Sequence, residues 1–581
     1  MHTNIPVNSD DYEMLQTAYR SVDRIMALAR SLNGVISGEH GIGITKIDFL
    51  TDEEMQPFWE YKKAIDPNDL FNRGKLQRGA NLNNAYTPSF ELLGAESLIL
   101  EKSQLGEISR MVKDCLRCGK CKPVCSTHVP RANLLYSPRN KILGVGLLTE
   151  AFLYEEQTRR GISFRHFNEL DDLSDHCTGC HRCLAKCPVK IDFGDVTTNI
   201  RNFLNHIGQK HLNIPVSMGM AFLNATDPKM VKALRLGVIK GGFRGQNFAH
   251  KMASKMLSGS LKAGKEQPRA TIGRPNVVEQ VVHFVNRPLP SGVPSKTARQ
   301  LLDIEDRKFV PIIRNPQLPD DTEAVFYFPG CGSERLFSQI SMAVLAMLWQ
   351  AGVQTVLPPG YVCCGYPQTA TGRKDKGDAL VTANRVLFHR VANTLNYLDI
   401  KNVVVSCGTC YDQLLEYHFE KIFPQCRIID IHEYLLEKEI RLPENAQGKP
   451  YLYHDPCHSP IKTTAPMNVV KGLMGDGVVL SDRCCGESGT FAVNRPDIAT
   501  QVKFRKQEEI NKNLGQLDNK DGVKLLTTCP ACLQGLNRYR LDTGVESEFL
   551  VVETARLLLG ENWQADYLEK LQNGGVEKVL L

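Results

Sequence analysis

The chain has 581 residues, 42% of them apolar and 23% charged, a composition typical of a soluble globular protein with several domains. Its net charge of +6, from 70 basic and 64 acidic residues, is too small for this length to indicate a nucleic-acid partner. The sequence lacks an apolar run long enough to span a bilayer and begins without a signal-peptide pattern, so we expect a cytoplasmic protein.

Residues 1–80 are predicted to form an α+β segment. Apolar residues recur on one helix face over residues 10–34, a short strand follows at 35–37, and a second helix runs from Asp52 to the Asp66–Pro67 pair. Between them lies the loop SGEHGIG, whose glycines permit backbone angles that a side chain would forbid. A mixed linker over residues 81–110 follows.

The nineteen cysteines stand in clusters with the spacing of metal ligands, and only Cys426 lies outside them. We expect Cys426 to be a small buried apolar residue. Disulfide scaffolds are typical of small secreted domains, whereas this chain is large and carries no secretory pattern. The cysteines therefore predict metal binding.

Two runs with the pattern Cys-x2-Cys-x2-Cys-x3-Cys occupy residues 115–125 and 177–187. Two-cluster ferredoxins use this run, and the fourth cysteine of each run ligates the [4Fe-4S] cubane of the other. Zinc is disfavoured because it takes four ligands, usually as two separated pairs. The runs predict a mainly helical two-cluster domain over residues 111–195. We expect one cubane on Cys115, Cys118, Cys121 and Cys187, and the other on Cys177, Cys180, Cys183 and Cys125.

Residues 196–320 are predicted to form a basic helical and linker region. Between positions 228 and 265 there are nine Lys or Arg and no Asp or Glu. The apolar residues interleaved with them are Met230, Leu234, Phe243, Met252, Met256 and Leu257. Two interpretations stay open: an amphipathic surface for anionic lipid, which would make the protein peripheral on the inner face of the membrane, or a solvated connector that packs on the protein.

Residues 321–440 and 448–560 are predicted to be two copies of one αβ unit. Each copy alternates β-branched runs with helical stretches, and its cysteines follow the expected strand ends, where ligands of open αβ sheets gather. The step from the Cys-Cys pair to the next cysteine motif is 43 residues in the first copy and 44 in the second. The cysteines of the two copies are Cys331, Cys363, Cys364, Cys407 and Cys410, then Cys457, Cys484, Cys485, Cys529 and Cys532.

This ten-cysteine pattern resembles the cysteine-rich CCG domains of heterodisulfide reductases and of iron–sulfur subunits of glycolate- and lactate-oxidising systems. The resemblance implies two tandem αβ CCG domains, each holding a noncubane [4Fe-4S] cluster or, in one copy, zinc. Five thiols exceed the needs of a zinc tetrahedron, but thiolates suit both metals, so both alternatives stay open.

The order helix, GVISGEHGIG, helix, IDPNDLFNRGKL resembles the end of flavin-linked oxidases that act on D-lactate, glycolate and D-2-hydroxyglutarate. The resemblance implies that Glu39 binds a divalent metal and that His40 is the general base for the substrate hydroxyl. It also implies cofactor-binding positions at Gly38, Gly41, Asn72 and Lys75. The family's proline in the final turn is replaced by Arg73. Taken alone, the loop would be interpreted as a surface turn.

The FAD-binding domain of that family has no counterpart in these residues. We therefore expect FAD to be shared with a separate oxidase subunit or with the other part of a divided fused enzyme. The sequence predicts the electron-transfer portion of a flavin-dependent D-2-hydroxyacid dehydrogenase that delivers electrons to a quinone or another respiratory acceptor. Two alternatives are a heterodisulfide-reductase-like thiol–disulfide oxidoreductase subunit, which the flavin-oxidase segment disfavours, and a zinc-bearing assembly subunit, which the ferredoxin runs disfavour.

Overall fold

The computed structural model describes residues 5, 12–37, 41–79, 104–128, 137–159, 164–256, 273–443, 449–517, 519–520 and 522–581. The chain forms two compact units, Met1–Leu98 and Ile99–Leu581. Among the helices of the described residues, none has the length and apolar character needed to cross a membrane.

The first unit is helical over its described residues, with α1 at Tyr12–Ser31, α2 at Gly43–Lys46, a 3-10 turn η1 at Ile47–Phe49 and α3 at Asp52–Ile65. Thr51 and Glu54 form a capping box at the start of α3, which satisfies two backbone N–H groups there. The two predicted helices are confirmed. The strand predicted at 35–37 is wrong, because no other strand of the described residues in this unit offers it hydrogen bonds.

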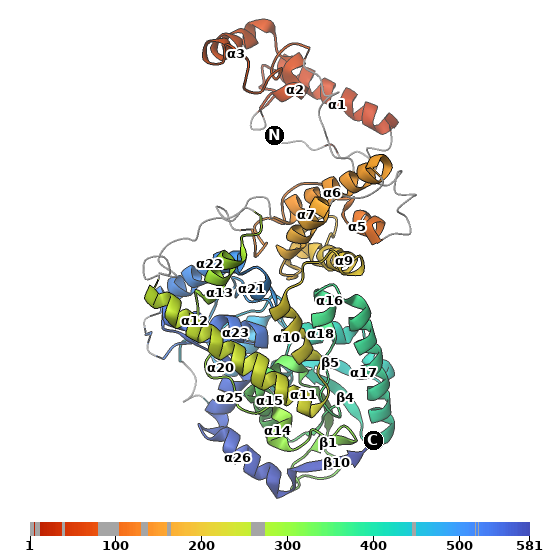
Figure 1. The fold of residues 1–581 in the computed structure, drawn as a ribbon, viewed down its shortest axis with the longest axis vertical. Coiled ribbons are helices and arrows are strands. Elements are labelled where there is room, and N and C mark those ends of the chain that lie inside the picture. The colour runs from red at the N-terminus through yellow and green to blue at the C-terminus, as the bar shows by residue number, and fades with distance from the viewer. Residues whose placement is uncertain are drawn as a thin grey trace. The chain divides into compact units, whose positions relative to one another are not determined.

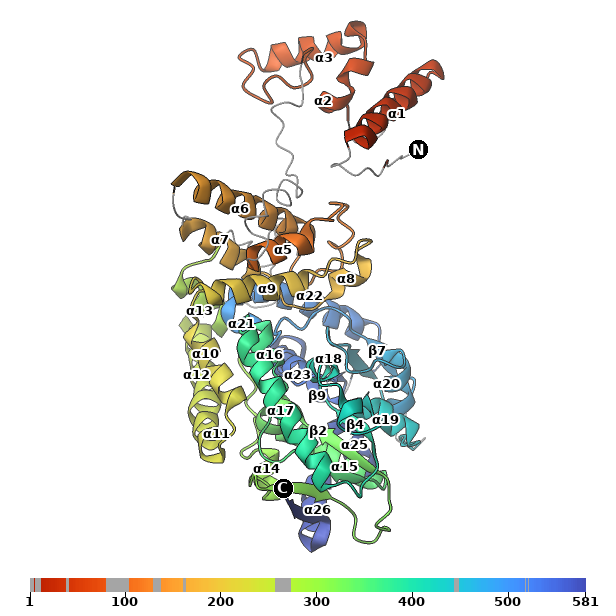
Figure 2. The same ribbon diagram turned by 90° about the vertical axis from the view of Figure 1, so that its right-hand side faces the viewer.

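The second unit begins with a helical layer around the ferredoxin-like runs (Figure 2). Its helices are α5 (Gln104–Val112), α6 (Pro138–Arg159), α7 (Phe164–Asp175), α8 (Arg182–Lys186) and α9 (Phe193–His206). Helix α9 packs against both α5 and α7. Its apolar residues Val196, Ile200 and Leu204 are fully buried there at helical spacing.

A connecting set of helices then runs along the side of the αβ body (Figures 1 and 2). It comprises α10 (Ile214–Asn224), α11 (Pro228–Leu234), the π-helical segment η3 (Arg235–Gly241), α12 (Gly242–Met256), α13 (Val277–Val285) and α14 (Ala298–Leu302). Helix α11, η3 and α12 follow one another without a break from residue 228 to 256. Arg235 is buried within η3 and donates to the carbonyl oxygen of Pro294, which ties this long helix to the body.

The first αβ domain is built on a six-stranded sheet in the order β10-β1-β3-β2-β4-β5. Its strands are β1 (Phe309–Ile313), β2 (Ala324–Phe328), β3 (Gln354–Val356), β4 (Ile400–Val405), β5 (Arg427–Asp430) and β10 (Val576–Leu580). Strand β1 is antiparallel to both of its neighbours, and the other pairs are parallel. The sheet thus extends beyond the predicted limits of 321–440 at both ends, and Figure 1 shows dark blue β10 returning beside green β1.

Helices cover both faces of this sheet. They are η4 (Gly332–Leu336), α15 (Ser338–Gln350), α16 (Tyr366–Ala370), α17 (Lys374–Thr394), α18 (Gly408–Leu415), η5 (Phe419–Lys421) and α19 (Ile431–Glu437). Because both faces are covered, all five residues of β2 are buried.

The second αβ domain has a parallel sheet in the order β7-β6-β8-β9. The strands are β6 (Tyr451–His454), β7 (Val478–Leu480), β8 (Lys524–Thr527) and β9 (Glu546–Phe549). This order repeats β3-β2-β4-β5 strand for strand, which confirms the predicted repeat of one αβ unit. The helices are α20 (Pro466–Met474), α21 (Phe491–Asn494), α22 (Pro496–Gly515), α23 (Pro530–Asn537), α24 (Arg540–Thr543), α25 (Leu550–Leu559), α26 (Trp563–Lys570) and the turn η7 (Leu571–Gly575).

The two αβ domains share one hydrophobic core. Helix α15 of the first domain packs along α25 of the second, and the residues buried between them include Met347, Leu348, Leu550 and Val551. A shared core of this size means that the domains behave as one body rather than as two linked by a flexible hinge.

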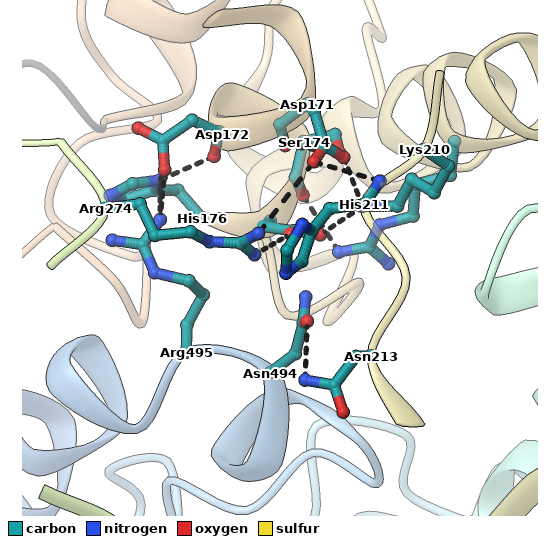
Figure 3. Close-up of polar contacts among 12 residues, drawn as sticks. Asp171, Asp172, Ser174, His176, Lys210, His211, Asn213, Arg274, Asn494 and Arg495 are labelled. Atoms are coloured by element: carbon teal, nitrogen blue, oxygen red, sulfur yellow. Dashed lines mark hydrogen bonds and ion pairs between the residues drawn. The ribbon is translucent and has the colours of Figure 1, made fainter. Parts of the chain in front are cut away.

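Charged side chains join the ferredoxin-like segment to the connecting region and to the second αβ domain (Figure 3). Asp175 pairs with Arg274 and with Lys210, at 2.7 Å from the lysine Nζ, and Arg495 at the start of α22 pairs with Asp172. Asp175 is only 2% exposed. Burial alone would raise the pKa of Asp175, but the surrounding cations, led by Lys210, lower it, so the carboxylate stays charged and the contact stays paired.

A substitution in the first domain tests the aromatic core of its sheet. Phe388 of α17 is fully buried, and its ring centroid lies 5.1 Å from that of Phe326 and 5.7 Å from that of Phe419. We expect Phe388→Ala to lower the free energy of unfolding by about 3–5 kcal/mol, measured by urea unfolding. Val386→Ala on the same helix should change it by less than about 0.5 kcal/mol because Val386 is 59% exposed. Equal effects of the two substitutions would contradict this packing.

Candidate metal centres

Three cysteines of the first run and the last cysteine of the second line one pocket. The run follows α5, and Cys187 lies at the end of α8. Apolar residues, among them Ile142 and Phe193, line the same pocket. Cys187 is near enough for its charge to act on Cys115. We call the set Cys115, Cys118, Cys121 and Cys187 the first ferredoxin group.

Cys125 of the first run lies with the cysteines of the second run. The charges of Cys177 and Cys180 act on Cys125. Cys183 borders the pocket of the first ferredoxin group, but the charges of Cys177 and Cys180 act on it as well. Ser126, which stands where the second run has a proline, donates a hydrogen bond from Oγ to Cys180 Sγ at 3.8 Å. We call the set Cys125, Cys177, Cys180 and Cys183 the second ferredoxin group. The structure thus brings the thiols together in the crossed arrangement, whereas their ligation of metal stays a prediction.

A buried lysine accompanies the second ferredoxin group. Lys141 is 1% exposed and donates hydrogen bonds to Thr127 Oγ1 at 3.2 Å and to the carbonyl oxygen of His176 at 2.7 Å. Burial raises the pKa of the Cys125 thiol, and the Lys141 ammonium opposes that rise. A cation held next to these thiols lowers the cost of the negative charge that thiolate ligands bring.

The five cysteines of the first αβ domain gather at the carboxyl ends of β2, β3 and β4. Cys331 Sγ and Cys363 Sγ are 3.9 Å apart, and the Cys364 thiol lies close enough to Cys363 and Cys410 to shift their pKa values. Cys407, the residue before α18, lies close enough to Cys410 to shift its pKa as well. We call Cys331, Cys363, Cys364, Cys407 and Cys410 the first repeat group.

The second αβ domain gathers its five cysteines in the same way, at the carboxyl ends of β6, β7 and β8. Cys485 Sγ and Cys532 Sγ are 3.4 Å apart, and Cys484 Sγ accepts a hydrogen bond from the Gly486 N–H at 3.4 Å. The Cys484 thiol lies close enough to Cys457 to raise the pKa of Cys457. We call Cys457, Cys484, Cys485, Cys529 and Cys532 the second repeat group.

Two contacts join these groups to one another. The thiols of Cys407 in the first domain and Cys529 in the second lie close enough for each to shift the pKa of the other, and so do those of Cys180 in the ferredoxin-like segment and Cys457. Gly408 permits the first contact, because a Cβ there would lie 1.8 Å from the carbonyl oxygen of His458. The thiols of the repeat groups and Cys180 therefore form a continuous series that we call the sulfur row. In order along the row they are Cys180, Cys457, Cys484, Cys485, Cys532, Cys529, Cys407, Cys410, Cys364, Cys363 and Cys331.

Buried cations surround the second repeat group. Lys506 is fully buried, donates to Ser481 at 2.7 Å and pairs with Glu509. Lys503 pairs with Glu487 at 3.0 Å, and burial lowers the pKa of Lys503 to about 8. Several positive charges thus stand close to five thiols in a water-poor environment, where they offset thiolate charge most effectively.

Arg335 takes a related place beside the first repeat group. It is fully buried and donates to the carbonyl oxygens of Leu223 at 2.6 Å and Ala225 at 2.8 Å. Its charge also acts on Cys331 and Cys363. The same guanidinium therefore fixes the connecting helices and stabilises negative charge at the thiols.

The donor sets fit iron–sulfur clusters. The thiols of each repeat group lie at distances well beyond the ~2.05 Å of a disulfide bond, and all nineteen cysteines are free. Five thiols in each repeat group exceed a zinc tetrahedron, and the four thiols of each ferredoxin group match the ligands of a cubane. Cys426 lies apart from all of these groups and packs against the aromatic core of the first domain.

The predicted flavin-site loop falls partly outside the described residues, which do not include Gly38, Glu39 and His40. On either side of them, Ser37 Oγ donates to the Gly41 carbonyl oxygen at 2.6 Å, and Lys46 Nζ donates to Ser37 Oγ at 3.0 Å. The loop is thus closed at its base by these two contacts.

The predicted final turn of this segment is ordered by Asp66. Its carboxylate accepts the N–H groups of Leu70 at 2.8 Å and Phe71 at 2.9 Å, and these hydrogen bonds lower its pKa. Asn72 follows in the left-handed region with φ of 48°, and Lys75 is exposed. The turn forms although Arg73 replaces the family's proline, and the cofactor-binding roles of Asn72 and Lys75 stay predictions.

The polar residues around the second repeat group are not marked by any cysteine-like pattern in the sequence. Lys503 and Lys506 lie at helical spacing on α22, but nothing in a single sequence distinguishes a buried lysine there from an exposed one. His454 could have been found, because it occupies in the second copy the position of Phe328 in the first, three residues before the leading cysteine.

The flavin-oxidase segment, the ferredoxin-like segment and both αβ domains match known protein families. Residues 1–76 match the family described as FAD linked oxidases, C-terminal domain; residues 111–191 match the 4Fe-4S dicluster domain; and residues 325–415 and 451–537 match the cysteine-rich CCG domain. A domain of unknown function (DUF3400) matches residues 537–581. The probable glycolate oxidase iron–sulfur subunit of Bacillus subtilis is 22% identical over 467 residues, which cover 77% of this chain and 93% of that protein.

The chain is homologous to glycolate oxidase iron–sulfur subunits and lactate utilization proteins. The glycolate oxidase iron–sulfur subunit of Escherichia coli is 21% identical over 70% of this chain and 86% of its own length. A mitochondrial D-lactate dehydrogenase [cytochrome] of Arabidopsis thaliana is 35% identical over 79 residues, only 14% of that protein. The predicted combination of a flavin-oxidase end, a dicluster segment and two CCG domains is therefore confirmed, and the chain is an iron–sulfur protein.

The crossed ligand arrangement can be tested at Cys187. We expect Cys187→Ser to damage the cluster of the first ferredoxin group, because its thiol lies with that group although its run belongs to the other. The Mössbauer and EPR spectra of anaerobically prepared Cys187→Ser should therefore match those of Cys118→Ser. Spectra that match those of Cys177→Ser would refute the crossed arrangement. Cys426→Ser, which lies outside all groups, is the control and should retain every cluster signal.

Proposed function

We propose that this chain is the electron-transfer portion of a flavin-dependent D-2-hydroxyacid dehydrogenase. The sulfur row carries the proposal, because it runs from the ferredoxin-like segment through the second repeat group to the first. Iron–sulfur clusters, when bound, supply one-electron carriers with potentials over about −700 to +450 mV, which a two-electron flavin donor requires. The protein's own part is to hold the thiols close together, exclude water and place cations beside them.

The proposed metals are two [4Fe-4S] cubanes in the ferredoxin groups and a noncubane [4Fe-4S] cluster or zinc in each repeat group. The crossed arrangement of the thiols supports the cubanes. Five thiols per repeat group support a cluster over zinc, because zinc uses four ligands.

The proposed electron donor is FAD, bound by an oxidase domain or subunit together with residues 1–76. Within this segment Glu39 would bind a divalent metal and His40 would take the hydroxyl proton of the substrate. Gly38, Gly41, Asn72 and Lys75 would contribute to the cofactor site. The substrate would be a D-2-hydroxy acid of the D-lactate, glycolate or D-2-hydroxyglutarate type, and the acceptor a quinone or another respiratory carrier.

Thiol–disulfide chemistry is a second candidate function. The observation that favours it is the closeness of two thiols from different domains, Cys407 and Cys529. A relative from Methanothermobacter marburgensis, 28% identical over 212 residues, is named as part of a fumarate reductase (CoM/CoB). The flavin-oxidase segment at residues 1–76 supports the hydroxyacid role instead.

Reconstitution tests the proposed function. Residues 1–581, loaded with iron and supplied with an FAD-binding oxidase domain, should couple oxidation of D-lactate, glycolate or D-2-hydroxyglutarate to reduction of a one-electron dye. His40→Ala should lower this rate by about 10²- to 10⁴-fold, the contribution of a general base, while dithionite still reduces the clusters. His418→Ala, at an exposed histidine, is the control. Full activity of His40→Ala would remove the base assignment, and a lack of hydroxyacid-dependent reduction would count against the function itself.

We propose further that the long helix α11–η3–α12 contacts an anionic membrane surface and makes the protein peripheral on the cytoplasmic face. Its exposed apolar side chains include Leu236 at 65% and Phe248 at 67%, and Met230 and Met252 are also exposed. No Asp or Glu occurs from Pro228 to Met256. Leu234 and Phe243, in contrast, pack on the αβ body, so this helix is both attached and amphipathic.

Vesicle binding tests this surface. The protein should co-sediment with vesicles of phosphatidylcholine and phosphatidylglycerol but not of phosphatidylcholine alone. Lys232→Glu with Lys251→Glu should weaken binding roughly 10-fold or more, since each Lys near an anionic surface contributes about 1 kcal/mol. Lys376→Glu on α17 is the matched control and should bind as the wild type does. Absence of binding to either vesicle type would favour the alternative of a solvated connector, and equal binding to both would contradict the role of the basic residues.

A further inference from the structure

The two copies of the αβ unit differ at one residue that points to metal chemistry. Phe328 is the last residue of β2, and His454 is the last residue of β6, its counterpart in the repeat. Each stands three residues before the leading cysteine of its group. The first copy therefore has an apolar side chain where the second has a side chain that can ligate a metal.

His454 lies among the thiols of the second repeat group. A ring nitrogen of His454 and the Sγ atoms of Cys485 and Cys532 all lie within 4.8 Å of one another. All three residues are buried, and His454 has no exposed surface. Three donor atoms of types that bind zinc and iron thus converge in a place that water does not reach.

The hydrogen bonds of His454 fix which nitrogen is free. Nδ1 lies 3.3 Å from the carbonyl oxygen of Ser481, and since a carbonyl oxygen only accepts, Nδ1 must carry the proton. Nε2 has no hydrogen-bond partner among the described residues. In the neutral imidazole Nε2 therefore presents a lone pair, the arrangement that a carbonyl oxygen gives to metal-binding histidines in general.

A charged imidazolium does not suit this environment. Lys506 donates to the same Ser481 carbonyl oxygen at 2.7 Å, so a second cation would lie beside the first in a buried place. A neutral imidazole, the form that binds metal, avoids this second buried charge.

When the second repeat group binds metal, the metal ion itself is the one partner that suits the lone pair of His454 Nε2. A thiol S–H of Cys485 or Cys532 can donate to it only while the thiol keeps its proton, and thiols lose that proton when they bind metal. After that loss, the lone pair would face anionic sulfur alone. A metal ion is the partner that satisfies both the sulfur atoms and the nitrogen.

We infer that His454 Nε2 ligates a metal of the second repeat group together with Cys485 and Cys532. This group is then a mixed sulfur and nitrogen site, whereas the first repeat group is bound by sulfur alone. The inference rests on the proposed function only in that the second repeat group holds a metal. Replacement of a thiolate ligand by a neutral imidazole raises the reduction potential of an iron–sulfur cluster. A cluster in the second repeat group would therefore have a higher reduction potential than one held by sulfur alone in the first.

The inference predicts a nitrogen signal that depends on residue 454. Anaerobically loaded full-length protein labelled with [15N]histidine should show the hyperfine coupling of a directly bound nitrogen in pulsed EPR of a paramagnetic state. If the second repeat group holds zinc, X-ray absorption at the zinc edge should show a nitrogen scatterer beside the sulfurs. His454→Phe should abolish either signal, lower the reduction potential of any cluster in this group and leave the first repeat group unchanged.

The repeat itself supplies the controls. Phenylalanine is already accommodated at the corresponding strand end in the first copy, so His454→Phe should fold, as circular dichroism would verify. Phe328→His in the His454→Phe background should create a nitrogen coupling at the first repeat group. This second variant keeps the inference testable even if His454→Phe proves unstable alone. His418→Ala should leave the histidine coupling intact.

Each outcome has a distinct meaning. A metal in the second repeat group without a histidine nitrogen, or a nitrogen signal that persists in His454→Phe, would overturn the inference and leave the proposed electron-transfer role standing. A second repeat group that takes up neither iron nor zinc under conditions that load the first would overturn both.

Discussion

The junction between the two αβ domains is the constraint on which the metal centres depend. Cysteines follow the carboxyl ends of parallel strands in both sheets, and the two sets of strand ends meet where Cys407 contacts Cys529. This approach requires a residue without a side chain at Gly408, whose Cβ would collide with the His458 carbonyl oxygen. A fold that needs only two separate metal sites could keep them apart. This fold holds them in contact, which is the arrangement that exchange of electrons needs.

Electrostatics imposes a second requirement on the same place. Thiolates buried without counter-charges would be strongly disfavoured, since the interior cannot solvate them as water does. The counter-charges are Lys506 and Lys503 at the second repeat group and Arg335 at the first. Each of these cations is held in place by hydrogen bonds or an ion pair to other residues of the unit. The cations therefore serve folding and metal binding together. Their loss would expose the thiols to protonation, which competes with metal.

Much of this arrangement follows from local sequence, and the rest depends on contacts between distant residues. Cysteine spacing predicts the dicluster segment, and the repeat predicts two parallel sheets whose strands end just before the cysteines. The strand predicted at 35–37 is absent because no described strand pairs with it. Strands β1 and β10 were missed because they pair over more than 260 positions, which no local pattern records. Lys503 and Lys506 cannot be predicted because burial of a polar side chain is decided by the packed fold, whereas alignment of the two copies does single out His454.

The pairing of β10 with β1 has a consequence for how the protein is made. On the ribosome, the cysteines of the first repeat group emerge long before residues 576–580, which close the edge of the sheet that carries them. The ferredoxin runs, by contrast, lie entirely upstream of that sheet. The sheet that carries the first repeat group is therefore complete only after the second αβ domain has been synthesised. Five cysteines from the middle of the chain thus belong to a sheet that is finished last, and free thiols in an incomplete fold are open to oxidation.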